Sequence, residues 1–183
     1  IKGIKHNKNI FVSMGGVDAF DMTLKVIKSL KNLSQDYFIS IIIGKFYKNK
    51  KNLLNQCKLL SCKFKIYQDP KNFHTLLKKN TFGICGTGIV TYEAMSLGIL
   101  TINIGHSSYH SYKGIEIQNS KVGYYLGDVR YNKKFTKLPE LIENLYQDEK
   151  KTNKIRKRAY KYIDGKGLTR ISKIIKKYLK DNE

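Results

Sequence analysis

The sequence predicts a single α/β domain, a Rossmann-like doubly wound parallel sheet followed by a helical C-terminal tail. Three observations predict this fold class. Short apolar runs alternate with stretches of helical periodicity along the 183 residues, which is typical of βαβ units. The apolar runs are nearly continuous, as expected for strands buried on both faces of a sheet. Two of these runs end in glycines and are followed at once by a helical stretch, which is the arrangement at the crevice of such sheets.

The first elements follow this alternation closely. Residues 10–14 form an apolar run that predicts a buried strand. Residues 19–33 come next, with apolar side chains at helical spacing. Residues 37–43 are rich in isoleucine, which favours a strand, and a glycine follows them. Residues 50–60 place two leucines and a cysteine on one side of an expected helix.

The central elements repeat the pattern with shorter pieces. A strand is expected at residues 64–67 and a short helix at residues 72–79. The apolar run at residues 82–85 predicts a further strand, and residues 90–97 predict the helix after it. A strand rich in isoleucine is expected at residues 99–104. Right-handed crossovers between these units favour helices on both faces of one sheet.

The last elements have weaker signals. A helix is expected at residues 112–119 and a short strand at residues 123–126. From residue 138 onward the sequence is helical in pattern and basic. We expect this tail to pack as helices on the sheet. Residues 1–183 are therefore treated as one domain, with residues 1–9 as an interdomain linker and the whole as the C-terminal half of a two-domain protein.

The net charge of +21 raises the possibility of a nucleic-acid-binding domain. Arginine is the preferred side chain for reading phosphates and bases, yet the basic residues include few arginines. We therefore expect no nucleic-acid partner, although peripheral contact with an anionic membrane stays open. The four arginines are Arg130, Arg156, Arg158 and Arg170.

The cysteines and the hydropathy pattern bear on location. Cys57, Cys62 and Cys85 are odd in number and lack metal-ligand spacing, which indicates a reducing compartment. Cys85 ends an apolar run, and we expect it to act as a small buried hydrophobic residue. The sequence contains no run of about 18 apolar residues, so we expect no membrane span. We expect a cytoplasmic protein with no metal and no cofactor.

The first candidate binding feature is the turn after the first expected strand. Gly15 and Gly16 end that strand, and a helix is expected directly after them. Glycine permits a positive φ and a close approach of the backbone to a ligand, and a helix N-terminus attracts anions. Asp18 is the expected N-cap of this helix. A tight turn that binds no ligand explains the same residues.

The second candidate feature is the glycine-rich segment around Thr87 and Gly88, which again joins a strand to a helix. Glu93 lies one turn into that helix. A carboxylate at this place accepts hydrogen bonds from a ribose diol in dinucleotide sites. The alternative is an ordinary solvated glutamate on the helix surface.

Together these segments resemble the C-terminal domain of GT-B-type nucleotide-sugar enzymes. The resemblance is strongest to the UDP-sugar hydrolases of pseudaminic acid biosynthesis, and more distant to glycosyltransferase family 28. It extends over roughly residues 9–179. The segments that carry it are Ile10-Phe11-Val12-Ser13-Met14-Gly15-Gly16-Val17-Asp18, Asp69-Pro70-Lys71-Asn72-Phe73-His74-Thr75-Leu76-Leu77, Thr87-Gly88-Ile89-Val90-Thr91-Tyr92-Glu93-Ala94 and Asp164-Gly165-Lys166-Gly167-Leu168-Thr169-Arg170-Ile171.

The resemblance implies a UDP-sugar ligand and a role for each matching position. Gly15 and Gly16 would lie beside the diphosphate. The backbone near Phe73 would hold the uracil, and Glu93 would bind the ribose hydroxyls. The segment after Ile104 would reach the diphosphate or the sugar. The catalytic base of the resembling hydrolases comes from an N-terminal lobe, so no residue of this chain is assigned as catalytic.

Two segments depart from the family pattern. Family members often have Gly-Ser-Thr before the glutamate helix, where this chain has Gly88-Ile89-Val90. They also often have Asn-Gln after the next strand, where this chain has His106-Ser107-Ser108-Tyr109-His110. His106, Tyr109 and His110 are therefore candidates for phosphate or sugar contact. Two loop histidines without a special role explain the same spacing.

Three functions remain open at this point. The first is the nucleotide-binding half of a UDP-sugar hydrolase or glycosyltransferase that makes bacterial surface polysaccharide or nonulosonic acid. The second is a non-catalytic nucleotide-sugar-binding module that needs a partner lobe. The third, which the arginine usage disfavours, is a basic nucleic-acid-binding domain.

Overall fold

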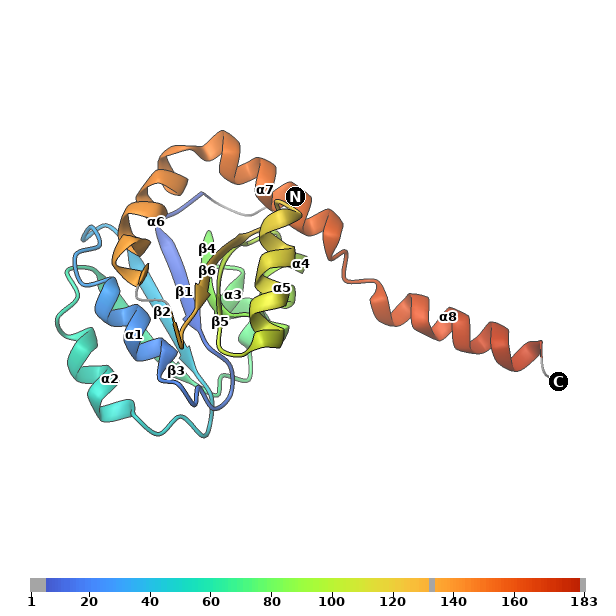
Figure 1. The fold of residues 1–183 in the computed structure, drawn as a ribbon, viewed down its shortest axis with the longest axis horizontal. Helices are drawn as coiled ribbons and strands as arrows, with labels where there is room; N and C mark the ends of the chain where they lie inside the picture. The colour runs from blue at the N-terminus through green and yellow to red at the C-terminus, as the bar shows by residue number, and fades with distance from the viewer. Residues whose placement is uncertain (1–5, 132–133, 182–183) are drawn as a thin grey trace.

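The computed structural model describes residues 6–131 and 134–181, and its centre is one parallel sheet of six strands. The strand order is β3-β2-β1-β4-β5-β6, the order of a classic doubly wound dinucleotide-binding fold. The predicted fold class is therefore confirmed (Figure 1). The strands are β1 (Asn9–Ser13), β2 (Phe38–Ile43), β3 (Lys63–Gln68), β4 (Phe82–Gly86), β5 (Leu100–Gly105) and β6 (Tyr124–Asp128).

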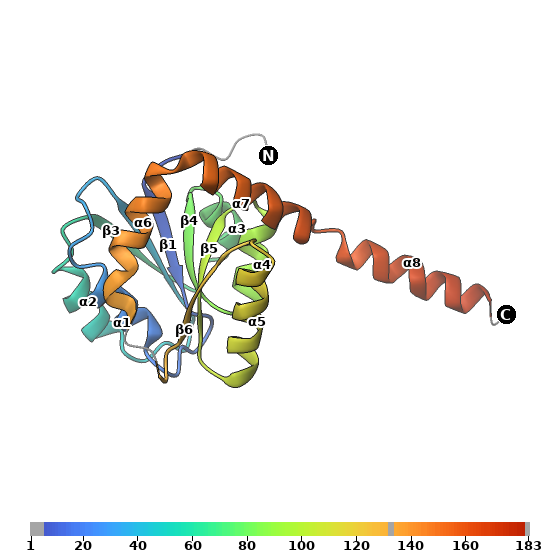
Figure 2. The ribbon, with the colours of Figure 1, turned by 45° about the horizontal axis from the view of Figure 1, so that its top comes forward.

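Helices cover both faces of the sheet (Figures 1 and 2). One face carries α1 (Met22–Ser29), α2 (Lys50–Cys57) and α6 (Leu138–Gln147). The other carries α3 (Phe73–Leu77), α4 (Ile89–Ser96) and α5 (Ser108–Asn119). A short 3₁₀ turn, η1 (Lys134–Lys137), leads into α6, and α7 (Glu149–Tyr162) crosses to pack against α4.

The core lies between the sheet and these helices. The strand residues Ile10, Val12, Ile39, Ile41 and Ile84 are completely buried. Their β-branched side chains suit a pleated surface that is covered on both sides. Cys85 is also completely buried among apolar neighbours, as the sequence predicted, and burial raises the pKa of its thiol.

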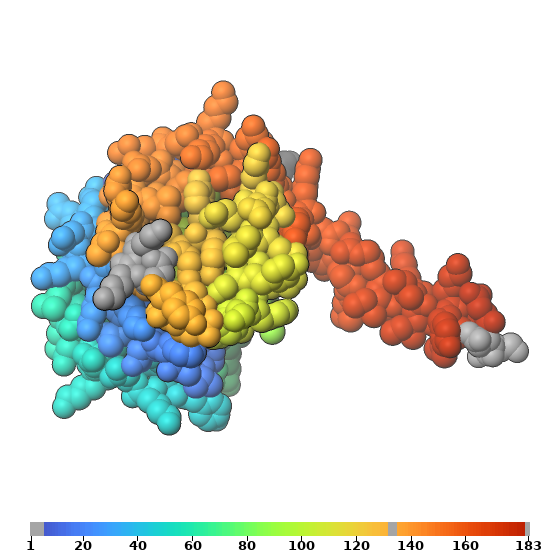
Figure 3. Space-filling view, in the orientation of Figure 1, coloured from blue at the N-terminus to red at the C-terminus, as the bar shows by residue number. Residues whose placement is uncertain are grey.

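The expected C-terminal packing is wrong for the last helix. α6 and α7 bury apolar side chains against the body, but α8 (Gly167–Lys180) has no buried residue. It extends away from the rest of the molecule (Figure 3). Other helices already cover both sheet faces, and the apolar side chains of α8, such as Ile171 and Ile174, are exposed. Within the described residues, no helix has the length and hydropathy needed to cross a membrane.

Two helix starts also differ from the prediction. α1 begins at Met22, not at residue 19, because an intervening turn places Asp18 and Asp21 at positive φ. α5 begins at Ser108, four residues before the expected start. Ser107 is its N-cap, and the Ser107 hydroxyl accepts a hydrogen bond from the backbone N–H of His110. Tyr109 and His110 are therefore helical residues, not loop residues.

Candidate functional site

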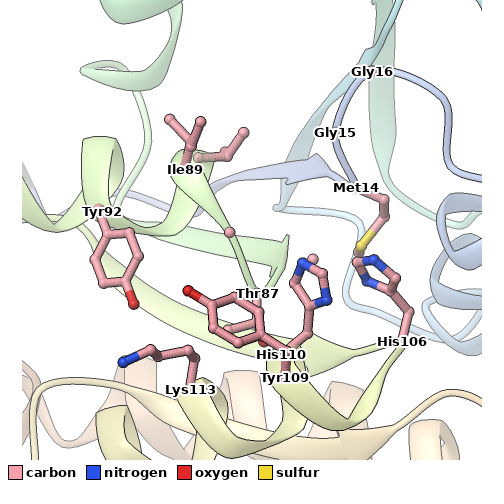
Figure 4. Close-up of a pocket in the computed structure, with 13 residues that line it drawn as sticks. Met14, Gly15, Gly16, Thr87, Ile89, Tyr92, His106, Tyr109, His110 and Lys113 are labelled. Atoms are coloured by element: carbon pink, nitrogen blue, oxygen red, sulfur yellow. The ribbon is translucent and has the colours of Figure 1, made fainter.

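β1 and β4 are neighbours at the centre of the sheet, and the chain leaves them in opposite directions. β1 is followed by β2 on one side, and β4 is followed by β5 on the other. In open α/β sheets this switch point leaves a crevice at the carboxyl ends of the strands, where ligands bind. The glycine turns at Gly15-Gly16 and Gly86-Thr87-Gly88 both lie there (Figure 4).

A cleft of about 510 Å³ opens at this point. It brings together three segments that are far apart in the sequence: the β1 turn, the β4 turn with the start of α4, and the β5 exit with the start of α5. Figure 4 shows the aromatic and histidine side chains around its mouth. The lining residues are Met14, Gly15, Gly16, Gly86, Thr87, Gly88, Ile89, Val90, Tyr92, His106, Tyr109, His110 and Lys113.

Two glycines shape the β1 turn: Gly15 by its positive φ and Gly44 by its close packing against the turn. Gly15 has φ +89°, a conformation that strains any residue with a Cβ. A Cβ at Gly16 would meet nothing within 4 Å, but the Gly16 backbone packs tightly against Gly44, which follows β2. A Cβ built on Gly44 would lie 2.0 Å from the Gly16 carbonyl oxygen. The glycine that follows the β2 strand is thus part of the architecture of the β1 turn.

Asp18 is not the N-cap residue of α1, and this corrects the prediction. Its carboxylate instead reaches forward and accepts hydrogen bonds from the backbone N–H groups of Met22 and Thr23, both at 2.8 Å. The side chain is nearly buried. Because this internal carboxylate occupies these two N–H groups of α1, they are not available to a bound anion.

The β4 turn has no such internal anion. Thr87 is 1% exposed, and its backbone N–H donates to the carbonyl of Ile104. The Thr87 hydroxyl oxygen is buried without a hydrogen-bond partner among the described residues. Thr91 in the first turn of α4 accepts from the N–H of Gly88 at 3.4 Å. A buried hydroxyl without a partner is costly and calls for an explanation, and Thr87 belongs to the wall of the cleft.

The β5 exit brings the two histidines face to face. The rings of His106 and His110 stack at 3.8 Å between centroids. The Nδ1 atom of His110 lies 2.7 Å from the Ser107 hydroxyl. The Nδ1 atom of His106 is buried and unpartnered among the described residues. Burial lowers the pKa of His106, and the neighbouring His110 lowers it further.

Phe73 and Glu93 lie beside the cleft but do not line it. Phe73, the first residue of α3, packs against the buried cluster that includes Leu77 of α3 and Ala94 of α4. His74 links the two helices, since its Nε2 atom lies 3.4 Å from a carboxylate oxygen of Glu93. The three residues thus form a group next to the main cleft, on the α4 side.

Tyr92 and Lys113 line the cleft and were missed by sequence reasoning. Lys113 lies one helical turn beyond His110 on α5, and its ammonium donates to Glu116 at 2.7 Å. Helical spacing from Tyr109 and His110 would have found it, had the start of α5 been placed correctly. Tyr92 is adjacent to Glu93, and no sequence signal separates it from an ordinary helix tyrosine.

Comparison with known proteins agrees with this architecture. Residues 1–162 match the family model described as "Glycosyl transferases group 1". An uncharacterized protein of Methanocaldococcus jannaschii, MJ1062, is 28% identical over 161 residues, which cover 80% of this chain and 33% of that protein. This chain therefore spans about a third of that relative's length.

Solved structures share the fold at low sequence identity. MurG of Acinetobacter baumannii superposes with a TM-score of 0.73 at 11% identity, over 97% of this chain and 54% of MurG. HepE of Anabaena, solved in complex with UDP-glucose, superposes with a TM-score of 0.71 at 15% identity, over 94% of this chain and 48% of HepE. The C-terminal domain of the group 1 glycosyl transferase LpcC from Francisella tularensis gives 0.66 at 18% identity, over 87% and 86%. This chain belongs to the group 1 glycosyl transferase family and has the fold of one GT-B half.

Proposed function

We propose that this member of the group 1 glycosyl transferase family binds a UDP-sugar in the cleft between β1 and β4. It would do so as the nucleotide-binding half of a glycosyltransferase or UDP-sugar hydrolase. The observation that carries the proposal is the β4 turn. Thr87, whose buried hydroxyl has no partner within the described part of the chain, lines the cleft beside glycine backbone and the start of α4. Such donors at a helix N-terminus suit a diphosphate.

The surroundings of the cleft fit the rest of a nucleotide. Glu93 presents a half-buried carboxylate on the adjoining side, which suits the ribose hydroxyls. Phe73 lies at the start of α3, where the backbone would hold the uracil. HepE, which has the same fold, was crystallised with UDP-glucose and with UDP and glucose, which supports this ligand class.

The reaction itself would need groups from a second, N-terminal lobe. This chain spans about a third of its M. jannaschii relative, which supports such a lobe. The pseudaminic acid hydrolase remains the narrower form of the proposal. Its support is the closing motif, in which the Asp164 carboxylate binds the Arg170 guanidinium at 2.7 and 3.0 Å. We place the protein in the cytoplasm, where nucleotide sugars are made.

UDP and UDP-glucose binding to the chain tests the proposal. A ligand at about 100 times its Kd should stabilise the fold by about 2.7 kcal/mol, which a thermal melt detects. Glu93→Ala should weaken UDP binding, whereas Glu140→Ala, an exposed glutamate on α6, should leave it unchanged. Absence of any shift at millimolar UDP would refute the proposed ligand. Unchanged affinity in Glu93→Ala would refute the ribose role alone.

A non-catalytic binding module is the second candidate function. Ile89 favours it, because this residue lines the cleft where a hydroxyl is common in the family, and it is 78% exposed. Turnover of a UDP-sugar by this chain alone would exclude the module. Binding to RNA or DNA at low salt that weakens steeply with added salt would instead support a nucleic-acid partner.

A further inference from the structure

The stacked pair of His106 and His110 is not explained by packing. Two imidazole rings at 3.8 Å cannot easily both carry a positive charge, because like charges at that distance repel. The Nδ1 atom of His106 is buried with no hydrogen-bond partner among the described residues. The pair lines the same cleft as the unpartnered Thr87 hydroxyl.

We propose that an anionic group bound in this cleft is held by the histidine pair in its singly protonated form, so that binding takes up one proton from solvent. The inference rests on the proposed nucleotide-sugar function. It adds that a negatively charged ligand changes the protonation of the two cleft histidines. The proton moves from solvent to a ring nitrogen, and no covalent bond to the ligand forms or breaks.

Two carboxylates near His106 favour a charge on its ring. Asp18, in the turn after β1, is already bound by two backbone N–H groups of α1. Asp128, at the end of β6, accepts from the Arg130 guanidinium and from the Ser111 hydroxyl. Both carboxylates favour a charge on His106, but burial and the neighbouring His110 outweigh them, so the pKa of His106 is lowered.

The remaining charges oppose protonation in the free protein. Arg130, just beyond β6, lowers the pKa of His106, and so does His110 on α5. Lys113, also on α5, adds a positive charge to the cleft wall, although Glu116 binds its ammonium. Burial is the largest cause of the lowered pKa. An incoming diphosphate reverses this balance, since its negative charge favours the protonated ring.

The sign of the pH effect follows from this balance. The free pair has a His106 pKa below the ordinary value of 6.5, and the bound pair has a higher one. Ligand affinity is therefore greatest below the free pKa and falls as pH rises toward the bound pKa. Within this window one linked proton changes the affinity by about tenfold per pH unit. Above the bound pKa the affinity is again independent of pH.

Calorimetric titration with UDP-glucose tests the inference on the unaltered chain. This ligand is suitable because its diphosphate is esterified at both ends and keeps a constant charge near neutral pH. The terminal phosphate of UDP, by contrast, titrates at about pH 6. Titrations between pH 6 and pH 8, in two phosphate-free buffers of different ionisation enthalpy, report the protons taken up. We expect net uptake approaching one proton and an affinity that falls with pH.

Variants then assign the proton. Replacing both rings in one variant, His106→Gln with His110→Gln, should abolish proton uptake and flatten the pH profile, with the loss of affinity confined to the acidic end. His6→Gln is the matched control, because His6 stacks on Tyr146 outside the cleft, and its profile should equal that of the unaltered protein. A merely structural role for either cleft histidine would lower affinity equally at every pH.

The outcomes separate the two proposals. UDP-glucose binding without proton uptake by the unaltered chain overturns the histidine inference and leaves the proposed ligand intact. Uptake that persists when both cleft histidines are replaced also overturns it. Absence of binding to both UDP and UDP-glucose refutes the proposed function and the histidine inference together. Because the first measurement needs no substitution, a variant that fails to fold does not prevent the test.

Discussion

The two glycine turns at the centre of the sheet look alike in sequence but differ in what they offer a ligand. After β1, the Asp18 carboxylate binds the first N–H groups of α1, so the protein supplies its own anion. After β4, Thr87 and Gly88 lead into α4 with a buried hydroxyl that has no partner among the described residues. A strand-glycine-helix pattern therefore indicates a potential anion site, and a single nearby carboxylate determines whether the N–H groups of that site are available to a ligand.

The largest expected effect comes from Asp18→Ala, which removes the internal anion of the β1 turn. Two buried N–H groups lose their acceptor, so the free energy of unfolding should fall by about 2 kcal/mol. Urea denaturation followed by circular dichroism measures this loss. Asp36→Ala is the control, because that aspartate forms an exposed pair with Lys8. A loss no greater than that of the control would show that the β1 turn does not need its carboxylate.

A smaller and opposite effect is expected from Thr87→Val in the β4 turn. Valine keeps the shape of threonine but removes the unpartnered hydroxyl, so stability should stay equal or rise slightly. UDP affinity should fall about tenfold, equivalent to about 1.4 kcal/mol, which calorimetric titration measures. Thr152→Val is a control for a buried threonine substitution away from the cleft: it loses the hydrogen bond to the Leu145 carbonyl and should lower stability without changing UDP affinity. Unchanged affinity in Thr87→Val would remove the β4 turn from the ligand site.

Adding a hydroxyl to the β4 turn should increase the difference in anion binding between the two turns. Ile89→Ser places a hydroxyl donor at the first position of α4, on the wall of the cleft. Because Ile89 is exposed, stability should change by less than about 0.5 kcal/mol. UDP affinity should rise by about threefold, or about 0.6 kcal/mol. A matched Val17→Ser in the β1 turn should give no gain in UDP affinity, because the Asp18 carboxylate already occupies N–H groups at the start of α1. An equal gain in UDP affinity in both variants would show that the two turns do not differ in anion binding.

The smallest effect is expected from deleting residues 167–183. α8 buries no side chain, so the melting temperature should stay within about 1 °C of that of the longer chain, and UDP affinity should not change. A thermal melt of the shortened chain measures this. A large loss of stability would show that α8 docks on the body in solution and that the extended arrangement in Figure 3 is not the stable one.

Most of the fold follows from local pattern. The strand positions agree within one or two residues. β1 and β2 are almost fully buried apolar runs, and the edge strand β3 alternates exposed and partly buried residues, so both kinds of strand leave a local pattern. The start of α5 was misplaced because His106-Ser107-Ser108 has no apolar periodicity. The signal there was the Ser107 cap, which depends on a single hydroxyl.

The sequence by itself determined the alternation of strands and helices, the two glycine turns and the residue types available to each. Hydrophobic periodicity and the stereochemistry of glycine are local properties, so one chain is enough to show them. Only the tertiary structure decided that the Asp18 carboxylate occupies N–H groups at the start of α1, and that the Thr87 hydroxyl is buried without a partner in the described part of the chain. It also decided that His106 and His110 stack at the mouth of the cleft. Those facts depend on strand order and on side-chain directions across the switch point, where residues distant in sequence meet.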